Sequence, residues 1–292
     1  MKYLVTPVCL LGLATFACAQ TKDEKAKTIE YLQSLQDEQG GFQAATAKDK
    51  NTAPALRPTF AAVRALQYLG GKPRDAAACA KFVDKCFDKE SGGFADATGK
   101  KTDVTSTALG LMAVVELKMP LDDYRDTAVK YLADNARTFE EIRIAAAGLE
   151  AAERRPKVVD DWLALIAKMR NEDGTYGKDD GKARETGSAA VAVLRLGGKL
   201  EHQDELLKAV KTGQRKDGGF GAAGAKSSDL ESTYRIMRLF HILKEKPADT
   251  AALKSFIAKC RNEDGGYATS PGEASTASAT YFAATILHWL EE

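Results

Sequence analysis

The sequence predicts an all-α protein, an (α/α)6 toroid in which six helical hairpins close into a ring. The first observation is a short glycine–aromatic motif that recurs along the chain, at Gly40-Gly41-Phe42, Gly92-Gly93-Phe94, Gly174-Thr175-Tyr176, Gly218-Gly219-Phe220 and Gly265-Gly266-Tyr267. The second is that each motif stands between two helical patterns of different character. The third is that the final helical pattern is as apolar as those in the middle of the chain.

The helical pattern before each motif has an apolar stripe and charged residues elsewhere, as at Ile29, Leu32 and Leu35. The pattern after each motif is apolar almost all round, as in FAAVRALQYL from Phe60 and STALGLMAVVEL from Ser106. A striped helix has a solvent face, whereas a helix that is apolar all round is buried. We therefore expect the first helix of each hairpin outside and the second inside.

The interval between Phe94 and Tyr176 is nearly double the others, and it contains a hairpin without the glycine motif, from Leu121 to Arg155. This completes a set of six. An open array needs polar capping repeats at its ends, whereas the last pattern, SATYFAATILHWL, is apolar, so closure is favoured. The first glycine of each motif is expected to end an outer helix, because glycine accepts the positive φ of a helix C-cap. These residues are Gly40, Gly92, Gly174, Gly218 and Gly265.

Two of these segments, QDEQGGF at 36–42 and QRKDGGF at 214–220, together with GGFGAAGAKSSD at 218–229, resemble a known repeat. They are similar to the repeats of protein prenyltransferase β subunits and squalene–hopene cyclases. The resemblance covers the chain from about Thr21 to its end. It implies the same toroid and, as an expectation, prenyl transfer or terpene cyclisation.

Residues 1–19 are predicted to be a signal peptide, with Lys2 before an apolar run and a cleavage site after Ala19. Residues 20–292 then form the toroid domain, secreted or periplasmic, with no transmembrane segment in the mature chain. A buried first helix and a lipoprotein at Cys18 are the alternatives. Removing the segment deletes Lys2 alone among the charged residues, which equalises the basic and acidic totals of 42 and 41. A neutral chain offers no field for nucleic acid or anionic lipid.

Three cysteines remain after that cleavage, Cys79, Cys86 and Cys260. The first two are seven residues apart on one helix, about 10 Å along its axis at 1.5 Å per residue. A disulfide needs Cα atoms within about 7 Å, so these two cannot pair. We expect all three to fill the core, and no C-x-x-C pair indicates a structural zinc site.

The longer loops lie within the hairpins and bring the amino termini of the inner helices to one mouth of the ring. Such termini carry partial positive charge and favour anions. The residues predicted to bind substrate there are Lys226, Arg184, Arg235, Tyr234, Arg143 and Arg57, and the tentative catalytic carboxylates are Asp229, Glu231 and Asp103. Alternatives stay open for each: Asp103 and Asp229 also fit helix N-caps, and Ser228–Glu231 and Thr138–Glu141 fit capping boxes. Arg143, Arg184 and Arg235 fit buried salt bridges equally well.

The resemblance also permits a residue-by-residue comparison. Prenyltransferase β subunits hold zinc with a D-x-C pattern at this inner helix and a histidine opening a later one. Asp229 matches the aspartate, but Glu231 stands in the cysteine position and Ser275-Thr276 opens the later helix. Lys226 alone matches the diphosphate-binding residues, and the D-x-D-D acid motif of the cyclases does not occur. No cofactor is therefore expected, with zinc implied only by the resemblance.

The leading hypothesis is an exported toroid that binds a small amphiphilic or isoprenoid-like ligand in its central cavity. One alternative is an exported carbohydrate-active (α/α) barrel enzyme, in which carboxylates such as Asp103 and Glu140 act as acid and base. Another is a non-catalytic binding scaffold. A protein partner is not indicated by any motif in the sequence.

Overall fold

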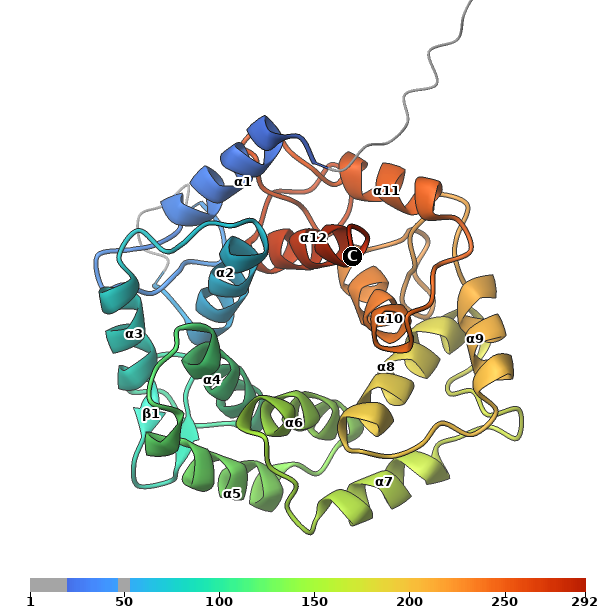
Figure 1. Cartoon of the computed structure of the whole chain (residues 1–292), viewed down its shortest axis with the longest axis horizontal. Helices are drawn as coiled ribbons and strands as arrows, with labels where there is room; N and C mark the ends of the chain where they lie inside the picture. The colour runs from blue at the N-terminus through green and yellow to red at the C-terminus, as the bar shows by residue number, and fades with distance from the viewer. Residues whose placement is uncertain (1–19, 47–52) are drawn as a thin grey trace, which may run out of the picture.

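A computed structural model describes residues 20–46 and 53–292, and the predicted signal peptide lies outside them. The described residues form twelve α-helices in two concentric layers (Figure 1). The inner layer is α2 (Leu56–Tyr68), α4 (Val104–Glu116), α6 (Phe139–Ala152), α8 (Lys182–Arg195), α10 (Leu230–Leu243) and α12 (Ala277–Trp289). The outer layer is α1 (Lys22–Ser34), α3 (Ala76–Lys85), α5 (Arg125–Asn135), α7 (Val159–Lys168), α9 (Gln203–Thr212) and α11 (Thr250–Lys259). The prediction of six hairpins is confirmed, including the hairpin α5–α6 that lacks the glycine motif.

The ring is closed. Each inner helix packs on the next, and α12 packs on both α10 and α2 (Figure 1). Lys25 at the start of α1 lies 3.1 Å from the carboxylate of Glu291 after α12, and Thr28 donates to the Gly265 carbonyl at 2.8 Å. The first and last hairpins therefore pack together, as the apolar last helix predicted.

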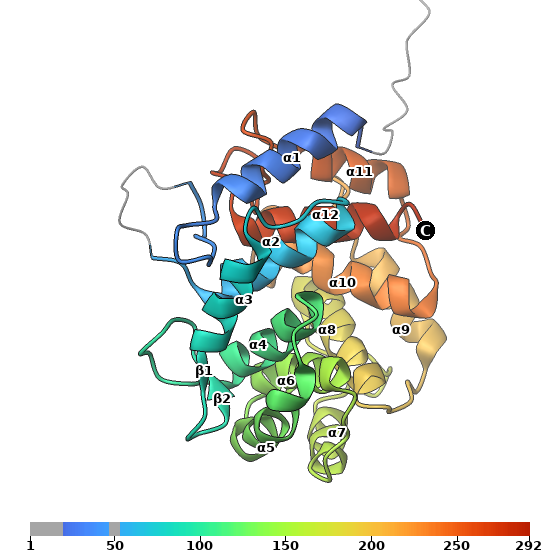
Figure 2. The same ribbon diagram turned by 60° about the vertical axis from the view of Figure 1, so that its left-hand side comes forward.

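The inner helices are buried because alanine and other small residues allow close packing on both neighbours. Between Val104 and Val114, every residue of α4 except Thr105 is buried. The outer helices bury only one stripe, such as Leu253, Phe256 and Ile257 of α11. Within the described residues, sheet is confined to β1 (Phe87–Asp88) and β2 (Gly93–Phe94), an antiparallel pair at the outer rim next to α3 and α5 (Figure 2). Short 3-10 turns occur at Leu121–Asp123 and Asp179–Gly181.

The glycines do not end the outer helices, which corrects the expectation. The helix α9 ends at Thr212, and Gly218 comes later, in the turn, with φ of +96°. A Cβ on Gly218 would lie 2.0 Å from the Ala252 carbonyl oxygen in the first turn of α11. On Gly265 it would lie 2.5 Å from the Lys27 carbonyl oxygen of α1. The glycines are required because the next outer helix approaches the turn so closely.

The aromatic residue of each motif is anchored by a threonine of the following inner helix. The Phe220 amide donates to the Thr233 hydroxyl at 3.0 Å, and the Tyr267 amide donates to Thr280 at the same distance. The other three motifs repeat this bond, from Phe42 to Thr59, Phe94 to Thr107 and Tyr176 to Thr186. These bonds fix the position of every inner helix except α6 relative to the loop that precedes it.

Candidate functional site

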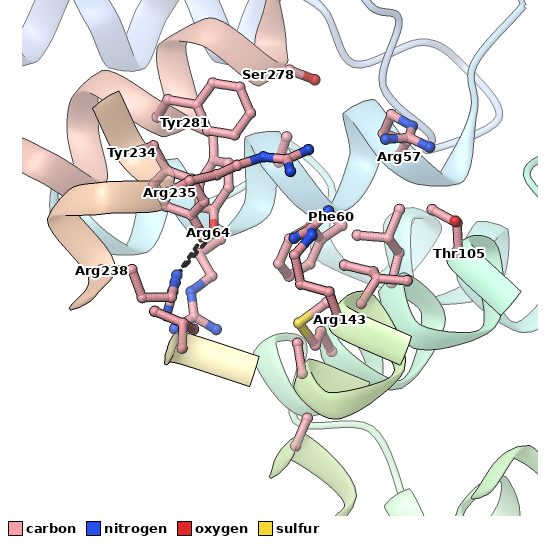
Figure 3. Close-up of a pocket in the computed structure, with 18 of the residues that line it drawn as sticks. Arg57, Phe60, Arg64, Thr105, Arg143, Tyr234, Arg235, Arg238, Ser278 and Tyr281 are labelled. Carbon is pink, nitrogen blue, oxygen red and sulfur yellow. Dashed lines mark hydrogen bonds between the residues drawn. The ribbon is translucent and has the colours of Figure 1, made fainter. Parts of the chain in front are cut away.

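A cavity of about 490 Å³ lies at the centre of the ring, lined by all six inner helices (Figure 3). Apolar side chains cover much of its wall, among them Phe60, Leu109, Met112, Ile144, Ala147, Val191 and Phe282. Small-molecule sites commonly enclose about 300–1,000 Å³ within largely apolar walls. Six arginines also line it, Arg57, Arg64, Arg143, Arg195, Arg235 and Arg238, opposed by the carboxylates Glu116, Glu140, Glu141, Glu150 and Glu231. The cavity is therefore apolar with charged groups concentrated at two depths.

The first charged group lies near the amino termini of α6, α8 and α10, and we call it the mouth network: Arg143, Glu140, Arg235, Glu231 and Arg184. Glu140 accepts from Arg143 at 2.9 Å and from Arg235 at 3.0 Å, which links α6 to α10. Glu231 accepts from Arg235 at 2.7 Å and lies 3.8 Å from Arg184 of α8. Burial raises the pKa of Glu140, but the two guanidinium groups outweigh it and hold that pKa below its usual value. The glutamate is thus ionised at neutral pH.

The structure divides the residues predicted from the sequence. Arg57, Arg143, Tyr234, Arg235 and Glu231 line the cavity. Figure 3 shows Arg57, Arg143 and Tyr234 among its lining. Four others are absent from the lining as the structure describes it: Lys226, which is exposed on the loop before α10, Arg184, Asp103 and Asp229.

Asp103 and Asp229 are N-caps. Each carboxylate accepts from a backbone amide three residues on, Ser106 at 2.8 Å and Ser232 at 2.7 Å. Thr138 and Glu141 form the capping box that the sequence predicted. The box predicted at Ser228–Glu231 was wrong, because Asp229 occupies the cap and Glu231 turns instead to Arg235.

The second charged group lies deeper, and we call it the inner arginine cluster: Arg64 of α2, Arg195 of α8 and Arg238 of α10. Arg238 is seven residues beyond Glu231 on α10, about 10 Å further along the axis. Arg195 lies 3.0 Å from Glu150, and Arg64 pairs with Glu116. Burial, and then the charge of Arg238, lower the pKa of Arg195.

Two tyrosines complete this wall. The hydroxyls of Tyr234 and Tyr281 are 2.5 Å apart, and Arg238 donates through Nη2 to Tyr234 (Figure 3). Burial raises the pKa of Tyr234, but Arg238 and Arg195 outweigh it and hold the pKa below its ordinary value. Burial raises the pKa of its neighbour Tyr281.

Neither the inner arginine cluster nor Tyr281 was predicted from the sequence. These arginines could have been found, since Arg64, Arg195 and Arg238 interrupt otherwise apolar inner helices just as Arg235 does. The predicted residues lie near the helix amino termini, whereas side chains two turns further along face the same cavity.

The side chains at the position of the prenyltransferase zinc site do not suit a metal. Asp229 is engaged with the Ser232 amide, and Glu231 is shared by two arginines. Ser275 donates to Asp264 at 2.8 Å, and Thr276 caps α12. No group of three or more histidine, cysteine, aspartate or glutamate side chains in the described part of the chain could hold a metal ion. Zinc is held by thiolates, imidazoles or free carboxylates. Here the carboxylates are already engaged, and the start of the later helix offers only hydroxyl groups.

Comparison with known proteins identifies the class to which this fold and cavity belong. The model of the prenyltransferase alpha-alpha toroid domain matches residues 2–77, 71–145 and 142–292. The chain therefore belongs to that family, which confirms the resemblance seen in the glycine repeats.

Particular relatives are distant. Drimenyl diphosphate synthase of Streptomyces showdoensis is 27% identical over 161 residues, which span 49% of this chain and only 30% of that protein. The protein geranylgeranyltransferase-I of Candida albicans, solved with GGPP, superposes with a TM-score of 0.65 at 14% identity, covering 81% of this chain and 84% of that one. A variant of the type II terpene cyclase MstE from Scytonema, solved with its substrate geranylgeranyl dihydroxybenzoate, gives 0.61 at 10% identity, covering 92% and 95%. At such identities the two structures show a common fold.

Within the described ranges, no helix has both the length and the apolar character needed to cross a membrane.

Proposed function

We propose that this protein binds an isoprenoid-like amphiphile in its central cavity. The main support for this proposal is the cavity itself. It has a volume of about 490 Å³ and a largely apolar wall that includes Leu109, Met112, Ile144 and Val191. Burial of an apolar chain there is favourable by about 25 cal/mol per Å² of surface removed from water. The family supports this choice, since two structural neighbours were solved with geranylgeranyl compounds. We also propose that the protein acts after export, because residues 1–19 have the sequence pattern of a signal peptide.

Chemical transformation of the ligand is not part of the proposal. The carboxylates of the mouth network are neutralised by Arg143 and Arg235, and a lowered pKa at Glu140 is the wrong direction for a general acid. The same observation argues against the carbohydrate-active enzyme, because glycoside hydrolysis needs a carboxylic acid whose pKa is raised. Binding requires none of this chemistry.

The test uses farnesol, a neutral C15 isoprenoid, with isothermal titration calorimetry and thermal melting. The parent protein should bind it saturably and melt at a higher temperature in its presence. The Ala147→Phe substitution should abolish binding, because Ala147 is buried and lines the cavity, and a phenyl ring there would obstruct the space for the isoprenoid chain. Ala209→Phe, at a half-buried position of outer helix α9 away from the cavity, is the matched control and should bind as the parent does. Absence of binding, or binding that survives Ala147→Phe, would overturn the proposal.

A further inference from the structure

Arg238 differs from the other two arginines of the inner cluster because it has no carboxylate partner in the described structure. Arg64 is paired with Glu116, and Arg195 with Glu150. The hydrogen bonds of Arg238 go only to phenols, through Nη2 to Tyr234 and, at 3.5 Å, to Tyr281. Its Nε is buried without a partner, and its Nη1 bonds no described residue.

Aromatic rings hold the guanidinium group in place without neutralising it. Its Cζ lies 4.9 Å from the centre of the Tyr234 ring and 4.8 Å from that of Trp289. Cation–π contacts position a cation, but they supply no counter-charge. The cluster therefore holds three positive charges against the two carboxylates of Glu116 and Glu150. Arg238 is half-buried, so its charge is partly removed from water without a counter-charge, and the deficit is one negative charge.

The mouth network, by contrast, is balanced. Its three arginines, Arg143, Arg184 and Arg235, face Glu140 and Glu231, and Arg184 has a further partner in Glu185 at 3.1 Å. Arg57 is exposed, so solvent already screens its charge. An anion that enters the cavity is therefore stabilised most by the charges of the inner cluster.

The opposite side of the ring supplies apolar side chains that precede, along α4 and α6, the two carboxylates Glu116 and Glu150 of the inner cluster. The helices that face α10 and α12 across the cavity are α4 and α6 (Figure 1). They contribute Leu109, Met112, Ile144 and Ala147 to the lining. A ligand with a charged head and an apolar tail matches these two walls.

We infer that Arg238, with the hydroxyls of Tyr234 and Tyr281, forms the subsite for a singly charged head group, and that the ligand is an isoprenoid-like carboxylic acid. This deepens the proposed function and depends on it. One carboxylate supplies the missing charge and accepts hydrogen bonds from a guanidinium and a phenol. A diphosphate would bring two or three charges to a cluster that lacks one. Neither head group requires a residue of the mouth.

The competing way to supply the charge is ionisation of Tyr234, because its hydroxyl touches Arg238 and the Tyr281 hydroxyl. Arg64, Arg195 and Arg238 are the cations that face this pair, and Glu116 and Glu150 are the anions. A tyrosinate absorbs near 295 nm. If the inference is correct, the ligand-free parent protein and Tyr234→Phe have the same absorbance at this wavelength at pH 7.5.

The binding test compares three probes with one C15 chain: farnesoic acid, farnesol and farnesyl diphosphate. In the parent, the acid should bind about tenfold or more tightly than the alcohol, since a charge-assisted hydrogen bond is added. Arg238→Met should remove this preference while leaving farnesol binding. Arg125→Met, which removes a paired arginine from outer helix α5, should keep the preference. Arg238→Lys retains the charge and should keep part of it, and this variant serves if the methionine variant fails to fold.

Five results would overturn the inference. The acid could bind no better than farnesol, in which case the cavity proposal stands and the subsite falls. The diphosphate could bind more tightly than the acid, which would contradict a singly charged head group. Arg143→Met could abolish the preference, which would place the head at the mouth. A tyrosinate signal from Tyr234 would show that the charge is already supplied. Failure of all three probes would reject the proposed function as well.

Discussion

Three thiols of the core sit where an outer helix ends or passes close to the inner layer. Cys79, Cys86 and Cys260 are free and at most 2% exposed, which confirms that they fill the core. Burial is the main cause that raises the pKa of each thiol, from 9.0 to about 12. Below about pH 8 the thiols are almost entirely neutral in both the folded and unfolded chain, so they make no pH-dependent difference there.

Stability should fall as the pH rises from about 9 towards 12. In this window the unfolded chain releases thiol protons that the folded chain retains, so each raised pKa costs folding free energy as the pH approaches it. Three pKa units correspond to an upper bound of about 4 kcal/mol per thiol. Urea unfolding at pH 8, 9.5 and 10.5 should therefore show a shallower decline for Cys260→Ala than for the parent, whatever the variant's stability at pH 8. Parallel declines would contradict this account.

At the scale of single residues, sequence reasoning found some of the cavity and missed the rest for an identifiable reason. Arg143 and Arg235 were found because a charge on an apolar helix must face the cavity or pair, and both do. Arg238 obeys the same rule. The role of Arg238 depends on which carboxylates lie close to it across the ring. Its neighbours from α2, α8 and α12 are brought together only when the ring closes.

At the scale of the element, the turns after outer helices α1 and α9 connect successive hairpins through side-chain hydrogen bonds. Gln214 donates to the carbonyls of Gly218 and Asp249, both at 2.8 Å, and accepts from the Asp249 amide at 2.7 Å. Gln36 repeats these bonds with Gly40 and Asp75. The sequence segments that carry the family resemblance are thus the ones that tie one hairpin to the next. Their positions were predicted, but the close approach that makes glycine necessary is a property of the assembled ring.

Gly218→Ala should strongly destabilise the fold. The new methyl group would lie 2.0 Å from the Ala252 carbonyl oxygen, and φ of +96° is itself unfavourable for alanine. Strained backbone alone costs about 1–3 kcal/mol, and displacement of α11 adds to this.

The matched control is Gly224→Ala, in the same loop at φ of +70° with open space around the added carbon. It should lose only about 1–2 kcal/mol, the cost of a left-handed alanine. Chemical denaturation compares the two. Equal losses would show that crowding against α11 does not matter.

At the scale of the whole molecule, hydrophobic patterning was sufficient to predict the architecture. The alternation of two helix types predicted the two layers, and the apolar final helix predicted closure of the ring. The predicted closure places α2, the inner helix at the other end of the sequence, against α12, as the structure shows.

Closure has a consequence for how the molecule unfolds. An open array can fray from its ends, because each repeat contacts only its neighbours. In a ring every inner helix has two neighbours, so no hairpin can leave without exposing apolar surface on both sides. Unfolding should therefore be one cooperative event, reported identically by Trp162 in α7 and Trp289 in α12, on opposite sides of the ring (Figure 1). These are the two tryptophans of the sequence, so Trp289→Phe and Trp162→Phe each leave a single fluorescent probe. Within each variant, the urea midpoint from fluorescence should equal that from helical circular dichroism; a separation between them would mean that the ring opens in stages.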